Sequence, residues 1–537
     1  MKLIKFGSIS ETTHFAHIET HDGVVLELRL ERILLADALN YINDAVASDP
    51  RITPPEGFSA WRPGQREVVK IAQSLHNNWL PVYIDAPTGS GKSVLALGIA
   101  AQREGTTAVL TADHQLQEQY AQYPQVKSIT GRRNWTCSIT GDNVEKAPCQ
   151  VGLMRHHDCG HFQQDTCAYY LQAKQGMEAD VCVTNYQYYL SSSLQRRMSS
   201  PICDEAHMIE SITRDYLKVS AYRDENDFPA GDSHGEWLRF YVQWNKDLNE
   251  LVQDMKYMEE KAATDDAKAN YKQLIYRYNN ELQKVGRMAD YIMKGEKHIR
   301  QLDGKRLTVT PLLGRIQMVG VDPVLMSATL VDPTIADPRQ LAIITMPSTF
   351  PKERRPVVPL NVVKLSRSSD DADYYTLART IDNMMIKHGD TKGLIHTVSY
   401  DLADKIKAHS QFPEMMITHR PGDRQQAIDQ FKAAPPGRVL LSPSSAQGLD
   451  LPYDECRWQM IAKMPFANLS DPVQKARSVH APQHVAMDTA RAVVQMAGRG
   501  MRAEDDQCVT YIADENWRWF YRQNSQLFPA WFREAIV

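Results

Sequence analysis

The sequence lacks the features that would place the chain in a membrane or in a secretory pathway. None of its apolar runs reaches the length of about 18 residues that a membrane-spanning helix needs. Its first residues, MKLIKFGSISETTHF, contain no apolar segment followed by small residues, which is the pattern of a signal peptide. We therefore expect a cytoplasmic protein with reduced thiols, in which disulfides are not the first explanation for clustered cysteines.

The sequence also lacks an excess of charge of either sign. Its 61 Lys and Arg residues against 65 Asp and Glu residues give a formal charge of −4, which argues against indiscriminate electrostatic coating of nucleic acid. Basic residues that bind phosphates must therefore line a local groove. With 537 residues, 43% of them hydrophobic and 23% charged, the chain has the composition of an ordinary globular protein and room for three or four domains.

Most of the chain has the alternating pattern of a parallel α/β sheet. From Trp61 onward, short apolar strands such as TAVLTA (107–112) are followed by amphipathic helices, and the alternation resumes after Pro311. Between them, residues 211–310 contain two long amphipathic segments separated by ATDDA, which predict an antiparallel helical hairpin. We interpret the aromatic and Met stripe of this hairpin as core.

The strongest chemical signal is a phosphate-binding loop. APTGSGKS (86–93) follows a predicted buried strand and opens a predicted helix, so backbone N–H groups and the helix N-terminus face an anion. Lys92 is expected to reach the outer phosphates and Ser93 to ligate Mg²⁺. The predicted ATP contacts in this loop are Thr88, Gly89, Ser90, Gly91, Lys92 and Ser93.

The acidic stretch Asp204-Glu205-Ala206-His207 supplies the second half of an ATPase site. Asp204 is expected to hold Mg²⁺, and Glu205 to orient and deprotonate the attacking water. An acidic pair alone is more often a solvated surface, and Pro201 makes the preceding strand weak. The combination with the phosphate loop is what makes the assignment strong.

Further stretches add residues to the predicted cleft. Arg499 and Arg502, in QMAGRGMR, are three apart on a predicted helix and can both face a γ-phosphate, although RGMR alone is more often a surface pair. Gln65, in RPGQ, offers an amide that could read the adenine edge. The other expected nucleotide contacts are Gly448, Asp450 and Gln495.

Four of the eight cysteines, Cys137, Cys149, Cys159 and Cys167, are gathered in one segment. Their gaps do not match the Cys-x-x-Cys spacing of zinc ribbons or ferredoxins. Spacing alone therefore leaves a metal site and plain packing equally open, with His156, His157 and His161 as substitute ligands. We expect Cys182 and Cys203 to be core residues, and Cys456 and Cys508 carry no signal.

The order of RPGQ, APTGSGKS, LQEQ, DEAH, SATL, QGLD and QMAGRGMR resembles that of the motifs of superfamily 2 helicases. GRRNWTC (131–137) and MPFANLSDP resemble motifs of the XPD/DinG branch of that family. The resemblance implies an α/β fold of two RecA-like P-loop lobes with parallel sheets. The residue pattern predicts an N-terminal accessory element (hairpin plus helix) at 1–50. The resemblance implies the other domains: a first lobe at 51–130, 168–210 and 311–340, an iron–sulfur domain at 131–167, a helical arch at 211–310 and a second lobe at 341–537.

The resemblance also implies an activity and its cofactors. A protein of this branch is an ATP-dependent helicase that moves 5′ to 3′ on single-stranded DNA and unwinds duplex DNA or a DNA–RNA hybrid. ATP and Mg²⁺ would lie between Lys92 and Glu205 on one lobe and Arg499 and Arg502 on the other. A 4Fe–4S cluster would be held by the four cysteines, and the strand would be contacted by Gln119, Arg132, Arg133, Trp135, Thr184, Asn185 and Tyr186.

Several alternatives stay open at this stage. The cysteines could hold zinc or no longer hold a cluster, and for Arg132 and Arg133 a solvated role is nearly as well supported. The protein could be an RNA helicase, a translocase recruited by a partner complex or, least favoured, a nucleotide-gated binding module. Residues 1–50 match no part of the family, and we expect them to dock a protein or ribonucleoprotein partner. We expect a monomer, of phage, plasmid or CRISPR-associated origin.

Overall fold

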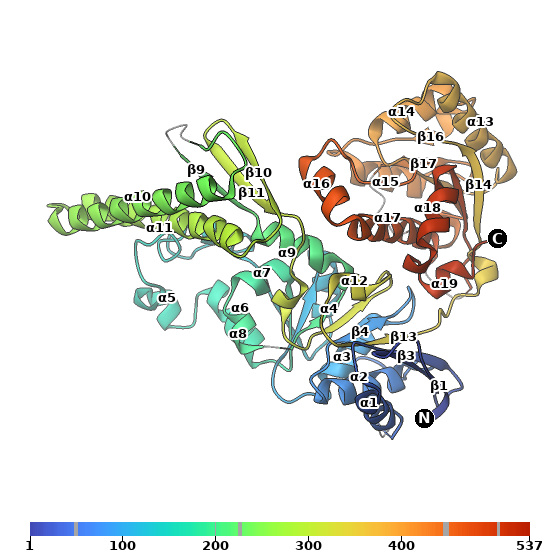
Figure 1. Cartoon of the computed structure of the whole chain (residues 1–537), viewed down its shortest axis with the longest axis horizontal. Coiled ribbons are helices and arrows are strands. Elements are labelled where there is room, and N and C mark those ends of the chain that lie inside the picture. Colours follow the sequence, from blue (N-terminus) through green and yellow to red (C-terminus); the bar gives the residue numbers. More distant parts are fainter. Residues whose placement is uncertain (48–51, 199, 224–227, 444–450, 502–504) are drawn as a thin grey trace.

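The computed structural model describes residues 1–47, 52–198, 200–223, 228–443, 451–501 and 505–537. The chain forms two lobes, each built on its own sheet, and a long helical hairpin projects from the first of them (Figure 1). The largely parallel sheets confirm the predicted α/β fold class. Three predicted site residues, Gly448, Asp450 and Arg502, lie outside the described residues.

The sheet of the first lobe is parallel through most of its width and antiparallel at one edge. Its strands, in spatial order, are β1 (Lys2–Ser8), β2 (Thr13–Glu19), β3 (Val25–Glu31), β13 (Leu341–Thr345), β4 (Val82–Asp85), β12 (Val324–Ser327), β8 (Ile202–Cys203), β5 (Thr107–Thr111), β7 (Val181–Asn185) and β6 (Val126–Ile129). The carboxyl ends of parallel strands meet at one edge of a sheet, which brings the segments after β4, β8 and β12 together.

The N-terminal strands are continuous with this sheet. Strand β3 pairs antiparallel with β13, which in turn runs parallel to β4. Leu26, Leu28 and Leu30 of β3 are buried in the same hydrophobic cluster as Ile84 of β4. Because removing β3 would expose this cluster, the N-terminal strands belong to the packing of the first lobe. Strand β1 forms the outer edge of the sheet, and α1 (Leu35–Ala47) follows β3.

The second lobe has an all-parallel sheet. Its order is β14 (Val357–Val363), β19 (Val509–Asp514), β18 (Trp458–Ile461), β15 (Gly393–His396), β17 (Val439–Ser442) and β16 (Met416–Ile417). Its helices are α13 (Asp371–Lys387), α14 (Tyr400–His409), α15 (Arg424–Ala433), α16 (Pro472–His480), α17 (Pro482–Ala497), α18 (Asn516–Asn524) and α19 (Ala530–Arg533). Those of the first lobe are α2 (Gln65–Asn77), α3 (Lys92–Ala100), α4 (His114–Ala121), α6 (Ala168–Glu178), α7 (Tyr186–Ser191), α8 (Leu194–Arg197), α9 (Ile209–Leu217) and α12 (Pro333–Ala336).

The helical hairpin consists of α10 (His234–Lys261) and α11 (Asp265–Met293), based on a small antiparallel sheet. The strands of that sheet are β10 (His298–Asp303), β11 (Arg306–Pro311) and β9 (Val219–Tyr222). Near the base, Tyr241 and Trp244 are buried. Toward the tip, Met258 is 44% exposed. The stripe is thus buried near the base of the hairpin and exposed at Met258.

The four-cysteine segment lies between β6 and α6 as short helical turns, including α5 (Gly160–Gln163). It touches the hairpin, since a Cβ on Gly152 would lie 3.4 Å from Cβ of Tyr276 in α11. Among the described residues, no helix combines the length and apolar character needed to cross a bilayer.

Candidate nucleotide site and cysteine cavity

The phosphate loop connects β4 to α3, which begins at Lys92. Its glycines adopt the left-handed backbone, with φ 83° at Gly89 and 77° at Gly91. A Cβ at Gly91 would lie 2.5 Å from Nε2 of Gln65, so a larger residue is excluded there by both conformation and space. Asp85, the residue before the loop, is buried, and this burial raises its pKa to about 8.

Gln65 braces this loop from α2. Its Nε2 donates to the carbonyl of Ser90 at 2.7 Å, and its Oε1 accepts from the backbone N–H of Arg62 at 2.8 Å. The side chain is buried. Both ends of the amide are therefore engaged within the protein, and the predicted reading of adenine is not available to Gln65 in this arrangement.

Asp204 follows the two-residue strand β8 and is held by two buried tyrosines. The hydroxyl of Tyr120 donates to Oδ2 of Asp204 at 2.8 Å, and that of Tyr186 donates to its backbone carbonyl at 2.7 Å. Burial and the neighbouring charge of Glu205 raise the pKa of Asp204. Burial and the nearby carboxylate of Asp204 raise the pKa of Tyr120, so its hydroxyl stays protonated and donates to Asp204.

Glu205 lies opposite Lys92, with 3.8 Å between Oε1 and Nζ. Its backbone is left-handed, with φ 49°, which is strained for a non-glycine residue and common at functional sites. Burial opposes ionisation of Glu205, but Lys92, His207 and Arg499 outweigh it and lower its pKa. Glu205 is thus ionised at neutral pH.

His207 links both lobes to this acidic pair. Its Nε2 accepts from Nε2 of Gln495, on α17 of the second lobe, at 2.6 Å. The proton is then on Nδ1, which lies 2.8 Å from Oγ of Ser327 and 3.2 Å from Oε2 of Glu205. A single imidazole therefore joins the DEAH stretch, the end of β12 and the second lobe.

Arg499 is close enough to lower the pKa of Glu205, but not from a helix as predicted. Helix α17 ends at Ala497, residues Gly498–Gly500 form a 3₁₀ turn and Met501 is extended. Arg499 therefore does not lie on the predicted helix, which ends before Gly498. Arg502 lies outside the described residues.

The residues predicted to contact a nucleic-acid strand divide into two groups. Thr184 is buried and donates to the carbonyl of Ile129 at 2.8 Å, and Tyr186 is buried against Asp204. Neither side chain can touch a nucleic-acid strand in this arrangement, because both lie in the interior of the first lobe. The exposed or half-buried members are Gln119, Arg132, Arg133, Trp135 and Asn185.

Several of these accessible residues already have partners. Arg133 forms an ion pair of 2.9 Å with Glu145, while remaining largely exposed. Nε1 of Trp135 donates to Oγ1 of Thr130 at 2.9 Å. Asn185 accepts from the N–H of Tyr188 and caps α7.

All four predicted cysteine ligands line one cavity, together with Met154, Phe162 and Tyr170. Burial raises the pKa of Cys149, and the nearby Cys137 and Cys159 add to this effect. Four sulfur donors around one apolar cavity match a ligand set of four thiolates. Within the described part of the chain, however, no three His, Cys, Asp or Glu side chains converge as a site for a single metal ion.

Sequence reasoning missed Tyr120 and Phe350. Tyr120 lies on α4, and only the crossing of α4 over the sheet brings it to Asp204. Phe350 belongs to the segment joining the lobes, and its ring packs directly on Gly89 of the phosphate loop. Neither residue belongs to a local motif, so the sequence offered no signal for either.

Comparison with known proteins gives two family matches. Residues 383–535 match the helicase C-terminal domain, and residues 59–226 match the type III restriction enzyme res subunit. No curated protein matches the sequence.

Solved structures share the fold of most of the chain. A structure titled XPD helicase has a TM-score of 0.56 at 13% identity, covering 88% of this chain and 99% of its own. The structure of S. tokodaii Xpd4 has a TM-score of 0.53, also at 13% identity, with coverages of 88% and 99%. At this identity the likeness shows the fold. Taken with the two family matches, the shared fold supports the interpretation of the chain as an XPD/DinG-like superfamily 2 helicase.

Proposed function

We propose that this ATP-dependent helicase acts on DNA, moving 5′ to 3′ along a single strand and unwinding duplex DNA or a DNA–RNA hybrid. The observation that supports the proposal is that the two lobes meet at the phosphate loop. Thr88 of that loop and Gly498, the residue before Arg499, line one cavity, and Lys92 lies 3.8 Å from Glu205. ATP bound there would touch both lobes, so its hydrolysis would change how they sit on each other. If the two lobes bind a nucleic-acid strand alternately, each cycle of hydrolysis moves the protein along that strand.

In the proposed mechanism each group has one task. Lys92 binds the outer phosphates, and Ser93 and Asp204 supply the oxygen ligands that Mg²⁺ prefers. Glu205, ionised because its pKa is lowered, orients the attacking water and accepts its proton. Arg499 stabilises the charge that develops on the transferred phosphoryl group.

The preference for DNA and the direction of movement are proposed from the GRRNWTC and MPFANLSDP motifs. Strand contacts are proposed for Gln119, Arg132, Arg133, Trp135 and Asn185, the accessible members of the predicted set. Arginine and tryptophan pair with phosphates and stack on bases without reading sequence, as a translocating protein requires.

Strand separation on tailed duplexes tests this proposal. We expect unwinding of a DNA duplex with a 5′ single-stranded tail, no unwinding of the matched duplex with a 3′ tail, and no activity of Lys92→Ala on either. Unwinding of only the 3′-tailed duplex would contradict the assigned direction, and a preference for all-RNA duplexes would favour an RNA helicase. Strand-stimulated ATP hydrolysis with neither duplex opened would favour a recruited translocase, with residues 1–50 as the proposed docking element.

We also propose that Cys137, Cys149, Cys159 and Cys167 hold a 4Fe–4S cluster, which, when bound, would fix the fold of residues 131–167. Protein purified without oxygen is expected to contain about four iron atoms per chain. Cys159→Ser is expected to lose that iron, whereas Cys182→Ser, at a buried strand position outside the cavity, should retain it. Stoichiometric zinc in place of iron would contradict the cluster.

A further inference from the structure

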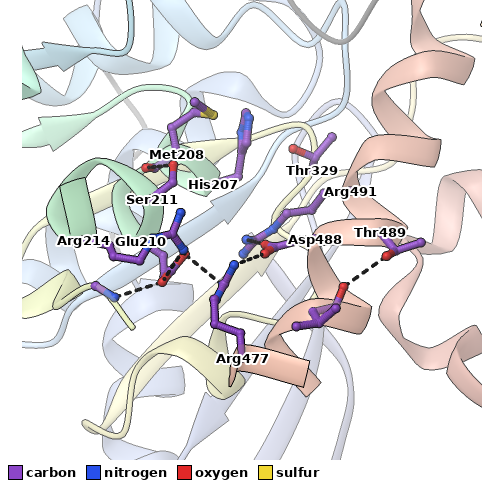
Figure 2. A network of polar contacts seen from close by, with 12 residues as sticks. His207, Met208, Glu210, Ser211, Arg214, Thr329, Arg477, Asp488, Thr489 and Arg491 are labelled. Atoms are coloured by element: carbon purple, nitrogen blue, oxygen red, sulfur yellow. Dashed lines mark hydrogen bonds and ion pairs between the residues drawn. The ribbon is translucent and has the colours of Figure 1, made fainter. Parts of the chain in front are cut away.

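A buried network of charged side chains joins the two lobes away from the phosphate loop (Figure 2). Glu210 lies in α9 of the first lobe, and Arg477 lies in α16 of the second. Oε2 of Glu210 is 3.3 Å from Nη2 of Arg477, and the two side chains are only 5% and 1% exposed. The pair therefore forms a charged contact between the lobes that water barely reaches.

Each partner is oriented by its own lobe. Glu210 accepts from the backbone N–H of Gly314 at 2.9 Å and pairs with Arg214, one turn further along α9, at 3.2 Å. Gly314 packs so closely on the carbonyl of Glu210 that a side chain would not fit. Arg477 is held from the other side by Asp488 of α17, with 3.0 Å between Nη1 and Oδ2. Each group is thus oriented by contacts within its own lobe as well as by the contact across the interface.

The same elements carry the groups of the nucleotide cleft. Glu205 and His207 immediately precede α9, whereas Gln495 lies in α17 and Arg499 in the turn after it. Asp488 and Gln495 are about two helical turns apart on a continuous helix. The Glu210–Arg477 pair therefore fixes where α17 lies against α9, and with it how far Arg499 is from Glu205.

We propose that Glu210 and Arg477 are positioning residues, whose buried ion pair holds the lobes in the closed arrangement before nucleotide binds. Removing one partner leaves the other charge buried without full compensation in the closed arrangement, but free to be hydrated when the lobes part. The closed fraction then falls, and the apparent affinity for ATP falls by the same factor. The inference rests on ATP hydrolysis in the cleft, and not on the direction of movement or the preference for DNA.

Steady-state ATP hydrolysis with saturating single-stranded DNA tests the inference. Glu210→Gln and Arg477→Gln are each expected to raise KM for ATP about tenfold and to leave kcat within about twofold, because saturating ATP closes the lobes. In the double variant, the fold increase in KM is expected to be at least about threefold smaller than the product of the two single increases. The reason is that both charges of the pair are then absent, so neither is left buried and unpaired. Arg477→Lys, which keeps the charge, should give an intermediate KM.

Arg379→Gln is the matched control. It removes an ion pair of 3.2 Å to the buried carboxylate of Asp382, but that pair lies within α13 of the second lobe and touches neither Glu210 nor Arg477, so KM should stay within about twofold of wild type. An unchanged KM in both Gln variants, strictly multiplicative effects in the double variant, or a loss confined to kcat would each overturn the positioning role. A wild-type protein that hydrolyses no ATP would overturn the proposed function together with this inference.

Discussion

Replacing Glu205 with glutamine is expected to lower kcat for ATP hydrolysis by about 10³-fold, while the dissociation constant of ATP stays within about threefold of wild type. The amide has the shape of the carboxylate but cannot accept a proton from water. Because Lys92, His207 and Arg499 lower the pKa of Glu205, its carboxylate form is the one present at neutral pH. Its loss therefore removes the proposed proton acceptor without removing the groups that bind phosphate.

The measurement pairs steady-state hydrolysis with binding of a fluorescent ATP analogue. Glu104→Gln, the same chemical change at an exposed position of the first lobe, is the control and should change neither quantity. Lys92→Ala should instead weaken binding as well as hydrolysis, because Lys92 is proposed to contact the phosphates themselves. A drop in kcat of less than about tenfold for Glu205→Gln would remove Glu205 from the proposed chemistry.

Replacing Arg499 with alanine is expected to lower kcat by about 10³-fold, with little change in ATP binding. Arginine contributes most when charge builds up on the transferred phosphoryl group, so its loss affects the transition state more than the bound substrate. Arg499→Lys should recover only part of the rate, since an ammonium group lacks the planar fork that contacts two phosphate oxygens.

Arg420→Ala is the control for this second variant. Arg420 also lies on the second lobe, where it forms an exposed ion pair of 2.8 Å with Asp404, so its removal should leave kcat unchanged. Single-turnover hydrolysis separates the chemical step from product release. A normal single-turnover rate in Arg499→Ala would show that the arginine acts on lobe movement rather than on phosphoryl transfer.

Predictions from local pattern agree well with the structure. Strand β4 ends at Asp85 and α3 begins at Lys92, as expected for a loop whose glycines allow left-handed turns. The helical hairpin also forms where its periodicity indicates. In these cases a few consecutive residues carry the information, because dihedral preference and the spacing of apolar side chains act over one or two turns.

Predictions that depended on the tertiary surroundings of a side chain agree less well with the structure. Thr184 lies near the carboxyl end of β7 and Tyr186 directly follows that strand, where contacts to nucleic acid were predicted, yet both side chains are buried. Gln65 has the right chemistry for adenine, but its amide is used by Ser90 and Arg62. Whether a polar side chain faces solvent, a ligand or another part of the chain depends on elements that are distant in sequence.

By itself, the sequence determined the phosphate loop, the acidic pair that follows β8, the gathering of four cysteines and the alternation that builds two parallel sheets, because each of these depends on neighbouring residues. Only the tertiary structure decided that β3 completes the first sheet, that His207 meets Gln495 and that Glu210 meets Arg477 across 267 positions of the chain. Contacts of this kind form when whole lobes pack against each other. The favourable free energy comes from the apolar surface that is buried between segments distant in sequence, and no short stretch of sequence encodes it.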